Sequence, residues 1–106
     1  MITMEQAEKA NDWIRDNARA YAQAKANRIY LEEFRKTKKA LLILQCEKGT
    51  NLDRESFAYA HEDYKGVLEG IKAAVEQEEE LRWLMIAAQA KFDMWRTQES
   101  SRRAGI

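Results

Sequence analysis

The sequence contains no proline and only four glycines among its 106 residues. Proline removes a backbone donor and clashes with the preceding helical turn, so its absence permits long unbroken helices. Cys46 is the only cysteine, which excludes an intrachain disulfide and favours a reducing, cytoplasmic setting. No run approaches the roughly 18 apolar residues of a membrane span, and the first residues lack the pattern of a signal peptide. We therefore expect no membrane partner.

The chain also lacks an excess of charge of either sign. Its 18 basic and 18 acidic residues give a formal net charge of zero, so no whole-chain attraction toward nucleic acid or membrane is expected. Charged residues make up 34% and hydrophobic residues 45%, which is typical of a folded, helix-rich chain. The length predicts one domain spanning residues 1–106.

Helix-forming residues fill most of the chain. Thr3 and Gln6 match a capping box, which predicts a helix over about 4–48. Its apolar stripe changes phase, so we expect a bend near 16–27, with Asp16 and Asn17 as candidate caps. The rest predicts a loop at 49–53, a short helix at about 54–60, a helix at about 62–98 and a frayed tail at 99–106. The fold class is all-α: a long antiparallel helical hairpin with a short extra helix near the turn.

The apolar stripes predict a register for the hairpin. The first helix carries one stripe before the bend and a second after it, and folding the chain back places Phe34 near Glu78. The basic residues of 35–39 then face the acidic residues of 76–80. Glu78 lies on the apolar stripe of the last helix, where it needs Arg35 or Arg82 as a partner. The first-helix stripes are Ala7, Ala10, Ile14, Ala18 and Tyr21, followed by Ala26, Tyr30, Phe34, Thr37, Leu41 and Leu44.

The stretch 81–95 is apolar on too many sides for one small monomer. One stripe suits packing inside the chain: Leu81, Leu84, Met85, Ala88, Phe92 and Trp95. A second stripe needs another cover, because a helix that is apolar nearly all round is normally buried all round. It includes Trp83, Ile86, Ala90 and Met94, and predicts a homodimer that forms a four-helix bundle of coiled-coil type. The alternative is that the short helix or a bent first helix covers this stripe.

Motifs for catalysis or metal binding are sparse. His61 is the only histidine, lies at a predicted helix start and is expected to cap it; with Cys46 it makes only two soft zinc ligands. The hairpin would bring four glutamates together, which leaves a metal-dependent nucleotide enzyme as a remote alternative. No phosphate-binding loop or nucleophile elbow is present. We expect no enzyme activity, no cofactor and no metal. The four glutamates are Glu32, Glu33, Glu79 and Glu80.

Basic residues at one end of the hairpin predict a possible nucleic-acid surface. They lie in the N-terminal part of the first helix and at the C-terminal end of the last helix. Tyr21 and Trp95 would add stacking surface there. The competing interpretation is that these cations complement a helix C-terminus, with the aromatic rings in the core. The alternative function is weak, sequence-independent DNA binding. The residues are Arg15, Arg19, Arg96, Arg102 and Arg103.

Residues 28–40 and 90–99 resemble a family of short, uncharacterised helical proteins of tailed bacteriophages and prophages. The resemblance covers most of the chain but includes no catalytic motif. It implies a gene among those for phage recombination or replication, and an accessory role in phage DNA metabolism or host takeover. The implied partner is a protein of phage or host DNA metabolism, and the implied location is the host cytoplasm. Together with the surplus apolar stripe, it predicts a non-catalytic helical interaction protein.

Overall fold

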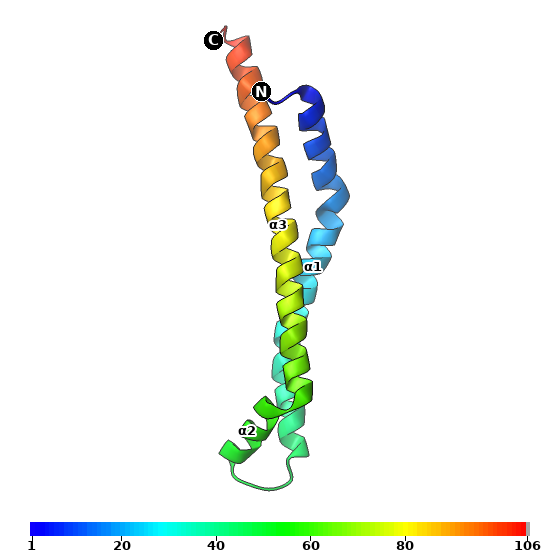
Figure 1. Ribbon diagram of the computed structural model, residues 1–106, viewed down its shortest axis with the longest axis vertical. Helices are drawn as coiled ribbons and strands as arrows, with labels where there is room; N and C mark the ends of the chain where they lie inside the picture. The colour runs from blue at the N-terminus through cyan, green and yellow to red at the C-terminus, as the bar shows by residue number, and fades with distance from the viewer. Residues whose placement is uncertain (106) are drawn as a thin grey trace. The chain divides into compact units, whose positions relative to one another are not determined.

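The computed structural model describes residues 1–105, and within that range the chain is entirely helical, without a strand. The order is α1 (Met4–Gln45), α2 (Asn51–Ala60) and α3 (Glu62–Arg103) (Figure 1). The all-α class with a short helix near the turn is confirmed. Most of the helix bounds differ slightly from the prediction: α1 ends earlier, the loop is 46–50, and α3 continues through 99–103, where a tail was predicted. The last residue of the predicted tail, Ile106, lies outside the described residues.

Polar caps begin the first two helices. The Thr3 capping box is as predicted: Gln6 N donates to Thr3 Oγ1 at 3.1 Å, and Thr3 N donates to Gln6 Oε1 at 2.9 Å. A second capping box starts α2, where Asp53 N donates to Thr50 Oγ1 and Thr50 N donates to Asp53 Oδ2. Since Thr50 is the cap, α2 begins three residues earlier than the sequence predicted.

The two short connections depend on Gly49 and His61. Gly49 adopts a φ of 111°, the left-handed region that favours glycine. An added Cβ there would lie 2.8 Å from the Cβ of Asp53, so the loop needs glycine for both conformation and space. His61 Nδ1 accepts a hydrogen bond from Asp63 N at 3.0 Å, which confirms its expected role at the start of α3.

The chain divides into two compact units, and each contains parts of both long helices. The first unit combines Met1–Gln23 with the chain from Glu79 onward, and the second unit is Ala24–Glu78. The boundary after Gln23 falls inside the stretch where a bend was predicted, yet α1 is helical without interruption from Met4 to Gln45. Asn17 does not cap a break there, because its side chain donates to the carbonyl of Trp13 at 2.8 Å.

In the first unit, the start of α1 runs antiparallel to the end of α3 (Figure 1). Ile2 N donates to Gln98 Oε1 at 3.1 Å, which ties the two ends together. The covered positions of both segments repeat every three or four residues, the spacing of a coiled-coil seam. On α1 these are Ala7, Ala10, Ile14, Asn17 and Tyr21, and on α3 they are Leu81, Met85, Ala88, Phe92 and Trp95.

In the second unit, the covered face of α1 is not the one that the sequence predicted. The predicted stripe is largely exposed, with Leu44 79% exposed. The covered residues instead follow the three-and-four spacing with position 35 left exposed, and they are Ala24, Arg28, Leu31, Lys38 and Leu42. Because two of these covered positions carry charged residues, the apolar residues alone did not predict this seam. They indicated a change of phase in the apolar stripe that the covered face does not have.

The core of the second unit gathers where α2 joins the long helices. Leu42 and Ala58 are fully buried and pack with Tyr64, while Ile43 covers the cluster in part. Leu42 is covered within the chain itself, because Ala58 of α2 packs against it. The same docking changes the register, since Lys38 pairs with Asp63 at 3.4 Å and Lys39 with Glu55 at 3.7 Å. Lys38 and Lys39 therefore meet the start of α3 and α2 rather than the acidic stretch 76–80.

Candidate interaction surface

The four residues predicted as an oligomer interface lie exposed on one side of α3. Trp83 is 59% exposed, Ile86 42% and Met94 54%, and Ala90 is exposed as well. At 100° per residue, these positions fall on the side of the helix opposite Leu81, Met85 and Phe92. We call the four residues the outer face. It presents an apolar strip to solvent while the other side of the same helix packs inside the first unit.

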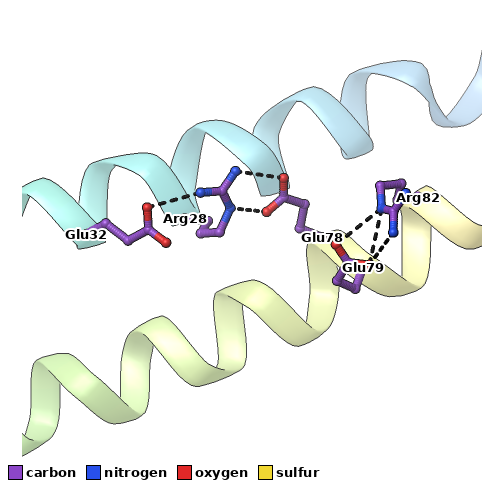
Figure 2. Close-up of polar contacts among 5 residues, drawn as sticks. All are labelled: Arg28, Glu32, Glu78, Glu79 and Arg82. Carbon is purple, nitrogen blue, oxygen red and sulfur yellow. Dashed lines mark hydrogen bonds and ion pairs between the residues drawn. The ribbon is translucent and has the colours of Figure 1, made fainter.

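The ring of Trp83 lies beside Arg82, which pairs with Glu79 on the same helix. The Cζ of Arg82 lies 4.8 Å from the centroid of the indole ring, at cation–π distance. Glu79 accepts hydrogen bonds from Arg82 Nη2 at 2.9 Å and from Arg82 Nε at 3.2 Å, which fixes the guanidinium (Figure 2). An exposed tryptophan with a restrained ring loses little entropy when it enters an interface. The i, i+3 spacing of Glu79 and Arg82 was visible in the sequence, but its effect on Trp83 was not predicted.

A shallow apolar groove lies at the side of the first unit's seam. It has a volume of about 340 Å³, and Trp13, Leu84 and Ala88 are among its apolar walls. Leu84 was predicted to pack inside the chain but is 46% exposed, because its position is at the margin of the seam. The apolar surface of α3 in this unit therefore extends beyond the outer face.

A buried ion pair joins α1 to α3 in the second unit. Glu78 is only 6% exposed and accepts hydrogen bonds from Arg28 through both carboxylate oxygens, from Nη2 at 3.1 Å and from Nε (Figure 2). Arg28 also donates to Glu32 at 3.0 Å. These bonds keep the pKa of Arg28 above its ordinary value, with the bond to Glu78 as the largest cause.

The need of Glu78 for an arginine was predicted, but Arg28 was missed as its partner. The predicted register placed Phe34 at this level, whereas the structure places Arg28 there, six positions earlier on α1. The signal that would have found it is the three-and-four spacing that continues from Tyr21 through Ala24 to Arg28. The geometry suits a structural role that aligns the two helices, as expected for Glu78 from the sequence.

Several arginines predicted to contact nucleic acid are occupied by acids of their own helix. Arg15 lies 3.1 Å from Asp16 and 3.5 Å from Asp12, and its pKa is raised above the ordinary value chiefly by Asp16. Arg96 pairs with Asp93 at 3.9 Å, and Arg102 with Glu99 at 2.6 Å. Arg19 and Arg103 are exposed. Tyr21 and Trp95, the expected stacking rings, are half-buried in the seam. Arg96 and Arg103 line one recess beside Trp95, but Glu99 lies in the same lining and offsets part of their charge.

The glutamates considered for metal binding take part in ion pairs with neighbouring cations. Glu32 pairs with Arg28, Glu33 with Lys36 at 3.4 Å, and Glu79 with Arg82. Among residues 1–105, no group of three or more histidine, cysteine or acidic side chains is placed to hold a metal ion. Cys46 is half-buried after the end of α1, and its thiol donates to the carbonyl of Lys48 at 3.3 Å.

Over the described residues, no helix is both long enough and apolar enough to span a bilayer. Comparisons with protein families, with curated proteins and with solved structures find no match for this chain.

Proposed function

We propose that this chain is a non-catalytic helical interaction protein that self-associates through the outer face of α3. The observation that carries the proposal is the small amount of apolar side chain that the core buries. In residues 1–105, Leu42 is the only large side chain that is fully buried, and most other buried apolar residues are alanines. Small chains with a limited core commonly gain stability by oligomerisation. Large apolar side chains that could make further contacts are present, but they are exposed on the surface.

A second copy of the chain is the occupant that best fits the outer face. Trp83, Ile86, Ala90 and Met94 repeat every three or four residues, the spacing that one helix needs to pack along another. A two-fold axis would place the same strip on both partners, as in most homodimers. The zero net charge removes long-range repulsion between copies. Two such copies would pack as a four-helix bundle.

Light scattering after size exclusion tests this proposal directly. We expect a mass of twice the 12.4 kDa chain mass, and a shift toward the monomer in Ile86→Asp. Leu44→Asp is the matched control, because it places the same charge on an exposed apolar residue of the second unit. Circular dichroism checks that each variant remains helical. A wild-type monomer at high concentration, or an Ile86→Asp dimer as stable as the wild type, would refute the proposal.

The role that we propose for the assembly is accessory, in phage DNA recombination or replication. Its support is the resemblance of residues 28–40 and 90–99 to phage and prophage proteins, together with a surface suited to protein contacts. Capture from infected cells, with wild-type protein and Ile86→Asp as paired baits, tests it. Recombination or replication proteins recovered by the wild type alone would support the role, and their absence from both baits would count against it.

A further inference from the structure

A basic recess lies in the second unit, whereas the outer face belongs to the first unit. It has a volume of about 280 Å³. No carboxylate lines it: its walls are Arg35, Lys36, Lys39, Tyr59 and Tyr64. Three cations and two phenols therefore converge from all three helices on one small space.

The cations of the recess are only loosely neutralised by the protein. Lys36 Nζ lies 3.4 Å from Glu33, and Lys39 Nζ lies 3.7 Å from Glu55. Strong charge-assisted hydrogen bonds are about 2.7–2.9 Å long, so both contacts are weak. No ion pair or hydrogen bond engages the Arg35 guanidinium in the described part of the chain. Each cation thus retains donors for an added anion.

The aromatic walls hold part of this site rigid. Tyr64 is 8% exposed and belongs to the core cluster with Leu42 and Ala58. Tyr59 meets Tyr64 edge to face at 5.3 Å, and Lys39 Nζ lies 4.5 Å above the Tyr59 ring. The contact with Tyr59 is the largest cause of a pKa of Lys39 above its ordinary value, which keeps the ammonium charged. Lys39 is therefore positioned as well as charged.

The position of Arg35 also calls for an explanation. The covered positions of α1 include Arg28 and Leu31. In the same three-and-four spacing, the next position is 35, and a coiled coil would place an apolar residue there. The chain carries an exposed arginine there, beside two lysines. A basic cluster at the point where α2 joins the long helices replaces apolar contacts that would stabilise the fold. The favourable binding of an anionic ligand to these cations would compensate for the lost stability.

We propose that this recess binds the phosphate group of a small phosphorylated molecule. A guanidinium and two ammonium groups supply the charge-assisted donors that phosphate oxygens prefer. The volume is at the lower end of ligand sites, which suits a phosphate group with a small substituent better than a long polymer. This site is independent of self-association and of the role proposed above.

Titration of the isotope-labelled protein with inorganic phosphate, followed by amide NMR, tests the proposal. Sodium chloride is adjusted to keep ionic strength constant, and adenosine monophosphate and a short DNA duplex serve as separate titrants. We expect saturable shifts around Tyr59 and Tyr64 with phosphate and with the nucleotide. Arg35→Gln should weaken binding at least about tenfold, the equivalent of one charge-assisted bond. Arg15→Gln, an exposed arginine elsewhere on α1, should leave binding unchanged.

The remaining outcomes overturn the proposal. Absence of saturable shifts at millimolar phosphate would remove the site. Equal weakening by Arg35→Gln and Arg15→Gln would show general charge attraction instead of a recess. Shifts with the DNA duplex but not with phosphate would assign the cations to nucleic acid. If Arg35→Gln loses helical structure, Lys36→Gln takes its place, because Lys36 is also an exposed recess cation.

Discussion

Arg28 of α1 and Glu78 of α3 form a two-bond ion pair inside the apolar seam of the second unit. Glu78 is buried, so its charge has lost most of its water and depends on the guanidinium. Such a pair adds little stability compared with two apolar residues, but another alignment of the helices would separate the buried Glu78 carboxylate from the Arg28 guanidinium. The pair therefore favours one register above its alternatives.

Removing the charge of Glu78 is expected to destabilise the second unit. Glu78→Gln should lower the free energy of unfolding by about 1–3 kcal/mol, the usual cost of a disrupted buried polar contact. Glu33→Gln is the control, because Glu33 makes an exposed pair with Lys36 and its loss should cost at most about 1 kcal/mol. Denaturant unfolding at one fixed protein concentration measures both. Equal losses would show that the buried pair has no special role.

Alanine in place of Gly66 should stabilise α3. A Cβ at Gly66 would meet nothing within 4 Å, and Gly66 lies inside the helix, where glycine costs about 1 kcal/mol relative to alanine. We expect Gly66→Ala to raise the free energy of unfolding by about that amount. Thermal or denaturant unfolding would measure the gain. A destabilised Gly66→Ala protein would mean that another chain approaches this position closely.

The opposite sign is expected at Gly49. Its φ of 111° strains any residue with a side chain, and a new Cβ would collide with Asp53 of the capping box. Gly49→Ala should therefore lower the free energy of unfolding by about 1–2 kcal/mol. The same unfolding assay checks this, with Gly66→Ala as the paired substitution of the same type. A neutral Gly49→Ala would show that the loop can adopt another conformation without cost.

The capping box of α2 should make stability depend on pH. The pKa of Asp53 lies below its ordinary value of 3.8, chiefly because the backbone amide of Thr50 donates to the carboxylate. Its contribution is therefore complete above that ordinary value and disappears as pH falls through the lower, folded pKa. We expect the difference in melting temperature between wild type and Asp53→Asn to be constant near neutral pH and to shrink in acid. A difference that grows in acid would contradict this assignment.

Local signals in the sequence were sufficient for the helices of this fold. Proline-free runs, the Thr3 capping box and Gly49 predicted three helices and their approximate bounds, because each of these effects acts within a few residues. The outer face was also predictable, since a surplus of apolar residues around one helix is visible in its spacing. The Thr50 cap was missed, and the sequence predicted a loop over 49–53 where α2 already begins at Asn51.

Long-range packing was predicted less well, and Arg28 explains why. The seam of α1 is not visible in the spacing of its apolar residues, because Arg28 and Lys38 occupy covered positions. The apolar residues from Tyr30 to Leu44 predicted a stripe that is largely exposed in the structure. The charges at 35–39 and 76–80 then suggested a register that the docking of α2 does not allow. Two charged segments of opposite sign can pair in many different registers, and the packing of the side chains decides which register forms.

The alanines of the first unit's seam have a consequence for the motion of the protein. Ala7 and Ala10 are buried, but each contributes little more than one methyl group, or about 0.8 kcal/mol. Since so few apolar contacts hold them, we expect the first turns of α1 to open locally more often than the rest of the chain. Amide hydrogens of these turns should then exchange with solvent faster than those around Leu42.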